Sequence, residues 1–155
     1  MGRRYLVPVA VMLSTACAGG PVAETVDLGP VATEPTTVWD GVYTSAQARR
    51  GASAYSEACS TCHARDLRGN SNAPSLVGSS FLFLWEDRSV GEFFTVVRTE
   101  MPTNAPNSLS AAAYLDIVAY VLEANGFPAG AVELGPERAL LEAIAITANS
   151  AAGPR

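Results

Sequence analysis

The chain of 155 residues has no lysine, a single histidine and three cysteines. Its ten basic residues are therefore all arginine, and 15 acidic residues outnumber them. The resulting net charge of -5 argues against nucleic-acid binding, which requires clustered positive charge on the protein. Such an acidic chain suits a soluble protein or one that meets a basic partner. The sequence also lacks a glycine-rich phosphate loop and any useful length of strand alternation, so nothing in it indicates a nucleotide-binding α/β domain.

The scarce residues are concentrated in one segment, EACSTCHARDL at 57–67. Cys59 and Cys62 are separated by two residues, and His63 follows directly. Three chemistries use such a grouping: structural zinc, a redox disulfide and covalently attached haem. Zinc requires four ligands, usually Cys and His, and no others remain in the folded part of the chain. A thioredoxin-type disulfide belongs at a strand-to-helix turn, whereas this motif follows a helical pattern and leads into a loop.

Haem fits best, because C-x-x-C-H is the attachment pattern of c-type haem. Both thiols, Cys59 and Cys62, would bond the porphyrin, and the imidazole of His63 would ligate the iron. The buried porphyrin would add apolar surface to a small core, so the haem-free chain is expected to fold poorly. The side chains expected to cover it are Leu76, Phe81, Trp85, Phe94 and Val97. Trp85 is favoured as a core residue, although its N–H could reach a haem propionate.

The second axial ligand follows by elimination. The common partners are His, Met, Cys and Tyr, and the chain has no second histidine. Of the three methionines, Met1 and Met12 lie in the N-terminal signal, which leaves Met101. Pro102 restricts Met101 to an extended backbone at the end of a predicted helix. Two interpretations stay open: Met101 ligates the iron, or it fills the core beside an open or water-filled site.

Periodic apolar positions predict an all-α domain. Main helices are expected over about 45–58, 90–100 and 111–125, with one or two helical turns over 81–85 and a weak helix after Pro136. Their predicted N-terminal caps are Thr44, Ser89 and Ser110, the first two with Gln47 and Glu92 at capping-box spacing. Gly51 lies on the apolar face of the first helix, which indicates that another backbone approaches closely. Leu140, Leu141 and Ile144 are expected on one side of the weak helix.

The N-terminal segment 1–18, MGRRYLVPVAVMLSTACA, is predicted to be an export signal, and export implies the bacterial periplasm. Two arginines precede an apolar run that is too short to span a membrane. Two cleavage patterns stay open. ACA fits a cut after Ala18, whereas STAC resembles a bacterial lipobox, cleaved before Cys17, which would then carry lipid and tether the protein to a membrane. Ser14 departs from the lipobox, which usually has a leucine-like residue there.

The rest of the chain divides into three segments by composition. Residues 19–41 are rich in Pro, Gly, Thr and Glu without a helical or strand period, and are predicted to form a flexible linker. Residues 42–127 are predicted to be the folded domain. Residues 128–155 are predicted to be a C-terminal extension, partly helical or disordered.

The chain resembles the class I mono-haem cytochromes c over about residues 48–125. The matching pieces are GASAYSEACSTCH, APSLVG at 73–78, TEMP at 99–102 and DIVAYVL at 116–122. The resemblance implies a cytochrome c fold, with three to four main helices wrapped around one covalently attached haem. It implies that the first and last helices cross where Gly51 meets Tyr120. It also implies that the Pro74 carbonyl accepts a hydrogen bond from the ring N–H of His63, which fixes the imidazole.

Longer stretches, such as VWDGVYTSAQARRGASAY and YVLEANGFPAG, are similar to cytochrome domains associated with quinoprotein alcohol dehydrogenases. This chain lacks the large β-propeller of such an enzyme, so the resemblance implies an electron carrier, not an enzyme. The expected partners are a dehydrogenase as donor and an oxidase or another cytochrome as acceptor, and the carrier is expected to be a monomer.

Two further functional interpretations stay open. A labile or open sixth position on the iron would make the protein a gas-binding sensor or a peroxidatic enzyme. The absence of a distal histidine counts against peroxidase chemistry. The other interpretation is an interaction module, in which the segment from Leu140 to Ile144 docks into a dehydrogenase. Such docking is compatible with electron transfer.

Overall fold

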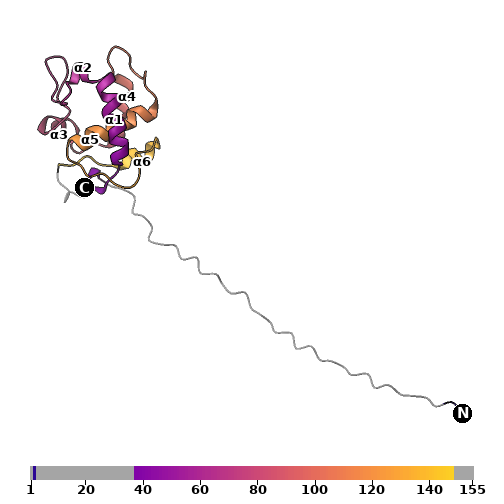
Figure 1. Cartoon of the computed structure of the whole chain (residues 1–155). Coiled ribbons are helices and arrows are strands. Elements are labelled where there is room, and N and C mark those ends of the chain that lie inside the picture. Colours follow the sequence, from indigo (N-terminus) through magenta and orange to yellow (C-terminus); the bar gives the residue numbers. More distant parts are fainter. Residues whose placement is uncertain (1, 3–36, 149–155) are drawn as a thin grey trace. The chain divides into compact units, whose positions relative to one another are not determined.

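Helices and loops make up the part of the chain that the computed structural model describes, which is residue 2 and residues 37–148 (Figure 1). The elements in chain order are the 3-10 turn η1 (Val38–Asp40) and the helices α1 (Ser45–Ala58), α2 (Ser60–His63), α3 (Ser79–Trp85), α4 (Val90–Glu100), α5 (Ala111–Ala124) and α6 (Arg138–Ala143). No strand occurs among these residues. The predicted all-α class is confirmed.

The helices α1 and α5 cross each other in close contact (Figure 1). A Cβ atom built on Gly51 would stand 1.8 Å from the carbonyl oxygen of Asp116 and 2.9 Å from Cβ of Tyr120. The rings of Tyr55 and Tyr120 pack beside this point, with centroids 5.4 Å apart. Only glycine leaves room for the two backbones here. The predicted close approach at Gly51, against Tyr120, is confirmed.

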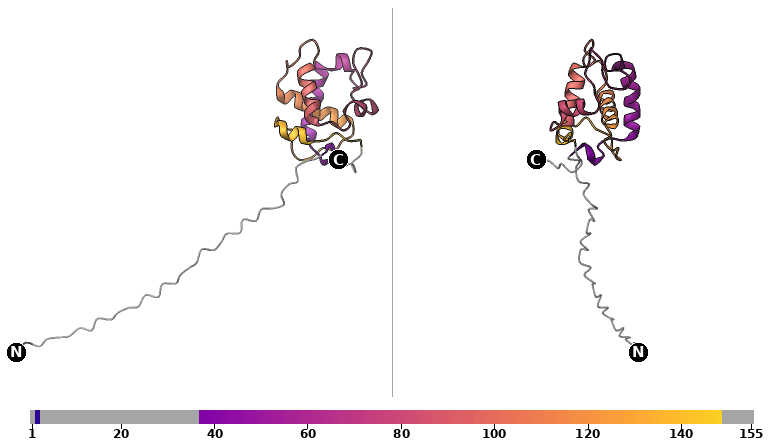
Figure 2. Two further views of the ribbon diagram at one scale, coloured as in Figure 1. Left: turned by 180° about the vertical axis from the view of Figure 1, so that it is seen from behind. Right: turned by 90° about the vertical axis from the view of Figure 1, so that its left-hand side faces the viewer.

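The core lies on both sides of α5, which runs between α1 and α4 (Figure 2). The predicted apolar face of α5 is fully buried, with no residue more than 2% exposed: Tyr114, Ile117, Val118, Val121 and Leu122. Helix α6 packs on α4, and a Cβ on Gly91 would stand 2.9 Å from the backbone nitrogen of Glu142. A small residue on α4 therefore lets the C-terminal segment approach.

The predicted helix caps are present. Ser89 and Glu92 form a complete capping box, and Ser110 accepts a hydrogen bond from the third residue of its helix. Thr44 caps α1 by accepting from the Gln47 N–H at 3.1 Å. The side chain of Gln47 does not complete a box, because it exchanges two hydrogen bonds with the backbone of Leu134, at 2.9 and 3.1 Å. A tertiary contact has taken the place of the local one.

The C-terminal residues 128–148 are a packed part of the domain, and not an extension apart from it. Leu141, Ile144 and Ile146 are at most 5% exposed. Leu140, expected on the same side, is 48% exposed, because neighbouring positions on a helix point in different directions. Leu141 and Ile144 are therefore occupied within the domain, and docking of this segment into a dehydrogenase stays a prediction.

The N-terminal boundary of the domain also differs from the prediction. Residues 37–41 were expected in the flexible linker, but Val38 is fully buried and Thr37 caps the turn η1 with a complete capping box. The Val38 N–H donates to the carbonyl of Ala145 at 2.9 Å, and the indole N–H of Trp39 donates to the carbonyl of Thr147 at 3.0 Å. Residues 19–36 and 149–155 lie outside the described part.

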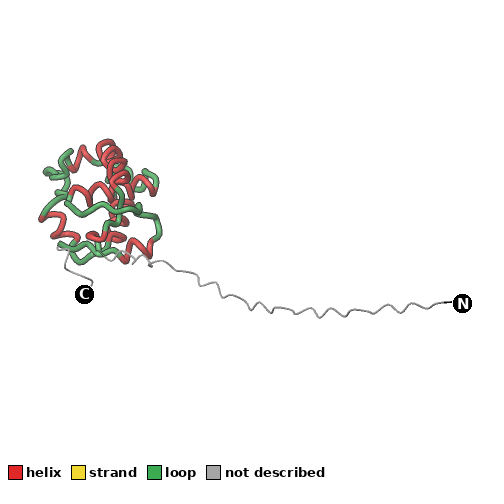
Figure 3. The backbone as a smooth tube through the Cα atoms, turned by 60° about the horizontal axis from the view of Figure 1, so that its bottom comes forward, coloured by secondary structure: helices red, strands yellow, loops and turns green. Residues whose placement is uncertain are grey.

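Residues 144–147 form backbone hydrogen bonds with two distant segments, the start of the domain and the loop before α4. Figure 3 shows the described residues as helices and loops. Ile146 donates to the carbonyl of Arg88 at 2.8 Å and accepts from Asp87 at 3.0 Å, while Val90 donates to Ile144 at 2.9 Å. These bonds hold the N-terminal end of α4 against the C-terminal segment. The beginning of the domain, the start of α4 and residues 144–147 thus meet at one place.

Substitution of Ile146 tests whether this segment contributes to folding. Ile146→Ala is expected to lower the free energy of unfolding by about 2–4 kcal/mol, because it leaves a cavity in the core. The measurement is urea unfolding of the haem-containing protein. The control is Leu140→Ala in the same segment, which should cost about 0.5 kcal/mol or less because the side chain is exposed. Equal effects of the two substitutions would contradict the packing described here.

Candidate functional site

The two cysteines and the histidine form a single turn of chain at the end of α1. Cys59 is the C-terminal cap of α1, and the N–H groups of Cys62 and His63 both donate to its carbonyl, at 3.2 and 3.0 Å. Both thiols are free, Cys59 half-buried and Cys62 exposed. Burial, with a smaller effect of the Cys62 thiol, raises the pKa of Cys59 to about 11. Without a bonding partner, Cys59 is therefore an uncharged thiol at neutral pH.

The imidazole of His63 is buried and held in one orientation. Its Nδ1 lies 3.0 Å from the carbonyl oxygen of Pro74, which is the contact that the family resemblance implies. A carbonyl oxygen can only accept, so Nδ1 carries the hydrogen and donates it. In the neutral ring the other nitrogen, Nε2, then has the lone pair, which is the form that ligates a metal. The His63 carbonyl accepts from Gly69 at 2.9 Å, which closes the following turn.

The loop that carries Pro74 is tied to the end of α5. The side-chain amide of Asn125 donates to the carbonyl of Leu76 at 2.9 Å and accepts from the N–H of Gly78 at 2.9 Å. Leu76 also donates to the carbonyl of Leu67 at 2.7 Å. These bonds fix the loop on both sides of the Pro74 contact, so the partner of His63 is held by the core.

Met101 is the C-terminal cap of α4 and has an extended backbone, with φ -119° and ψ 149°. Its N–H donates to the carbonyl of Val97 at 3.2 Å, and its carbonyl accepts from the hydroxyl of Tyr114 at 2.8 Å. The predicted extended conformation before Pro102 is confirmed. The side chain is half-buried.

The apolar side chains expected around a haem fall into two groups. Phe81, Trp85 and Phe94 are buried. Leu76 and Val97 are only half-buried, as are Val77 and Leu82. The half-buried set would lose further exposed area against a flat apolar group.

Trp85 makes the contacts of a core residue. Its ring packs edge-on against Phe93, with centroids 4.7 Å apart, and the guanidinium of Arg88 lies 4.5 Å from the ring centroid. These contacts agree with the favoured packing role of Trp85. Its assignment as a haem contact stays a prediction.

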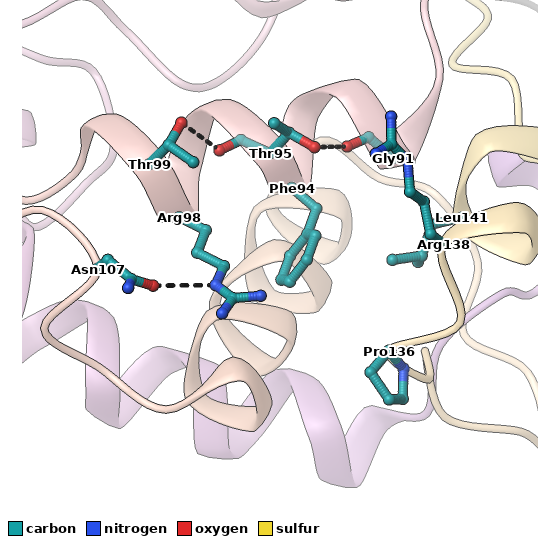
Figure 4. A pocket seen from close by; sticks show the side chains of 9 residues that line it. All are labelled: Gly91, Phe94, Thr95, Arg98, Thr99, Asn107, Pro136, Arg138 and Leu141. Atoms are coloured by element: carbon teal, nitrogen blue, oxygen red, sulfur yellow. Dashed lines mark hydrogen bonds between the residues drawn. The ribbon is translucent and has the colours of Figure 1, made fainter.

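A pocket of about 430 Å³ lies between α4 and the C-terminal segment (Figure 4). Its lining residues are Gly91, Phe94, Thr95, Arg98, Thr99, Asn107, Pro136, Arg138 and Leu141. None of them belongs to the cysteine–histidine turn, and Met101 is not among them. Phe94, which we expected to cover a porphyrin, also lines this pocket, and its role beside a haem stays a prediction. The pocket is therefore lined by none of the four residues predicted to bind the haem or its iron.

Sequence reasoning missed the polar side chains that hold the ligand segments. Tyr114 was assigned only to an apolar face and Asn125 only to a helix end, yet each hydrogen-bonds a loop. The hydroxyl of Tyr55 likewise donates to the carbonyl of Ala64, the residue after His63, at 2.7 Å. A buried tyrosine needs a hydrogen-bond partner, so a tyrosine at a buried helix position was a usable signal.

The residues of these two segments fit a c-type haem. The turn presents two free thiols beside an imidazole whose protonated nitrogen faces a carbonyl, which leaves the other nitrogen free to ligate iron. Met101 supplies a thioether on a separate segment. In the described residues, no cluster of three or more His, Cys, Asp or Glu side chains could hold a metal ion, and no helix is long and apolar enough to cross a membrane.

Part of the chain matches a known protein family. Residues 46–121 match the family model described as cytochrome c oxidase, cbb3-type, subunit III. No curated protein matches the chain. Among solved structures, the crystal structure of the sulfane dehydrogenase SoxCD from Paracoccus pantotrophus is similar, with a TM-score of 0.42 and 21% identity. The similarity covers 66% of this chain and 60% of that chain, which is less than two thirds of its length.

Substitution of Asn125 tests the connection between α5 and the loop that orients His63. Asn125→Ala removes the bonds to Leu76 and Gly78, and is expected to lower the free energy of unfolding by about 1–3 kcal/mol. Hydrogen exchange at the Gly78 amide should become faster, which NMR would detect. Asn72→Ala, at an exposed position of the same loop, is the control and should change the unfolding free energy by about 0.5 kcal/mol or less. An unchanged Gly78 amide in Asn125→Ala would contradict the connection.

Proposed function

We propose that this chain is a class I mono-haem cytochrome c, which carries single electrons on a c-type haem attached to Cys59 and Cys62; the match of residues 46–121 to a cytochrome family model supports this. The observation that carries the proposal is the pair of ligand segments. One holds His63 with its Nδ1–H on the Pro74 carbonyl, and the other holds Met101 between α4 and α5. Nitrogen on one side and sulfur on the other is the ligand set typical of electron-transferring cytochromes c.

The protein's part in this function is to hold the ligands and to keep the environment constant. When bound, haem supplies a one-electron couple between Fe(II) and Fe(III). His63 cannot turn, because its ring is buried and its Nδ1–H is engaged. Met101 would supply the second ligand to the iron and leave no coordination site for a substrate. A rigid ligand pair lets the charge change with little rearrangement, and a thioether ligand in an apolar setting raises the reduction potential.

Export and the redox partners are proposed from the sequence. Arg3 and Arg4 before an apolar run support export to the periplasm, where c-type haem attachment occurs. The same proposal includes a lipid on Cys17, which the lipobox-like sequence STAC supports. The partners proposed are a dehydrogenase as donor and an oxidase or another cytochrome as acceptor. The excess of acidic residues supports partners with a basic docking surface.

Met101→Ala tests the electron-carrier proposal. The ferric wild type should show the weak near-infrared absorption band of sulfur bonded to haem iron, and its reduced form should not bind CO. Met101→Ala should lose the band entirely and bind CO, because the sixth position is then open. Its reduction potential should fall. Absorption spectroscopy and a redox titration measure these changes.

Met101→His is the matched variant, since it keeps a strong ligand and removes the sulfur. It should lose the band and still exclude CO. A wild type that lacks the band and binds CO would reject the proposal in favour of the alternative, a gas sensor or peroxidatic enzyme.

Loss of haem attachment tests the dependence of folding on the cofactor. The double variant Cys59→Ser/Cys62→Ser should contain no covalent haem and should lose most of its helical circular dichroism, because the half-buried apolar side chains stay exposed to water. Cys17→Ser is the control and should keep both haem and helix content. A folded haem-free double variant would show that the core alone suffices.

A further inference from the structure

The hydroxyl of Tyr114 connects α5 to the backbone of Met101. Tyr114 is 1% exposed, and its hydroxyl donates to the Met101 carbonyl at 2.8 Å. The N–H of Leu109 donates weakly to the hydroxyl oxygen of Tyr114, at 3.5 Å. One buried hydroxyl thus contacts both ends of the loop between α4 and α5.

The rest of this loop is closed by its own hydrogen bonds. The N–H of Asn107 donates to the carbonyl of Arg98 at 3.0 Å, and the Nε–H of Arg98 donates to the side chain of Asn107 at 3.0 Å. The N–H of Met101 is engaged by Val97 in the last turn of α4. The Met101 carbonyl is held from outside this loop, by a residue of the central helix. Held at N–H and at carbonyl, the backbone of Met101 limits where its side chain can reach.

We propose that Tyr114 is a positioning residue for Met101: its hydroxyl holds the ligand segment against α5 and so determines how readily an external ligand displaces the thioether. This inference rests on the proposed role of Met101 as the sixth ligand. Without the hydroxyl, the Met101 carbonyl loses this partner, and the remaining hydrogen bonds of the loop run to α4 and within the loop itself. The open form, with the thioether off the iron, then becomes more populated.

Tyr43 offers a matched control. It is also 1% exposed, and its hydroxyl donates to the carbonyl of Phe127, at 2.5 Å. Phe127 follows α5, so this bond closes a different part of the chain. Tyr114→Phe and Tyr43→Phe therefore remove the same kind of bond from equally buried rings, and differ in which segment is released.

The test is an imidazole titration of the ferric, haem-containing protein, followed by the loss of the near-infrared sulfur–iron band. Tyr114→Phe should need roughly two- to tenfold less imidazole than the wild type to lose half of the band, the range expected for one hydrogen bond. Tyr43→Phe should titrate like the wild type. Because each substitution removes only a hydroxyl and the haem is covalent, both variants should fold, and circular dichroism checks this.

Three results would overturn the inference, and they separate it from the proposed function. If Tyr114→Phe titrates like the wild type, Tyr114 does not position Met101, although Met101 can still be the ligand. If Tyr43→Phe shifts as much as Tyr114→Phe, the effect is general loosening of the domain. If the wild type itself lacks the band, Met101 is not bound to iron, and both proposals fail together.

Discussion

The close crossing of α1 and α5 at Gly51 is the constraint on which both ligand segments depend. The backbones are so near that no side chain fits between them. From this crossing, α1 runs directly into the turn that carries Cys59 and His63. On the other side of the crossing, α5 reaches Met101 through the hydroxyl of Tyr114. Two segments that lie far apart in the sequence are thus placed by one pair of helices.

The C-terminal end of α5 also positions the segment that holds His63. Asn125 holds the loop at Leu76 and Gly78, and this loop brings the Pro74 carbonyl to the imidazole of His63. The tautomer of the histidine is therefore determined by a helix that follows it by about fifty residues in the chain. Orientation of a metal ligand by a second set of residues is a common way in which proteins tune iron. Here α5 supplies that set on both sides.

The C-terminal segment stabilises the helix that ends at Met101. Residues 144–147 exchange backbone hydrogen bonds with the loop before α4 and with Val38 at the start of the domain. Residues 144–147 and Val38 both lie outside residues 46–121, the part that matches the family model. Small domains have small hydrophobic cores, so burial of Ile144 and Ile146 adds stability that residues 46–121 alone would lack.

An exposed ion pair between Arg50 and Glu133 adds a further contact to the C-terminal segment. Its hydrogen bond to Arg50 lowers the pKa of Glu133, so the contact weakens when acid protonates this carboxylate.

What the sequence determined by itself was short-range. The attachment motif, the cap at Ser89 and the extended backbone of Met101 before a proline depend on residues a few positions apart, and local chemistry decides them. The contact of Gly51 was predictable as a close approach, because a glycine on an apolar helix face has few other uses. Tertiary structure decided the rest. The side chain of Gln47 bonds to Leu134, 87 positions away, and does not complete the local cap. The hydroxyl of Tyr114 donates to the carbonyl of Met101, on another segment. Such partners depend on which surfaces meet after the chain folds, and no spacing within a segment encodes that meeting.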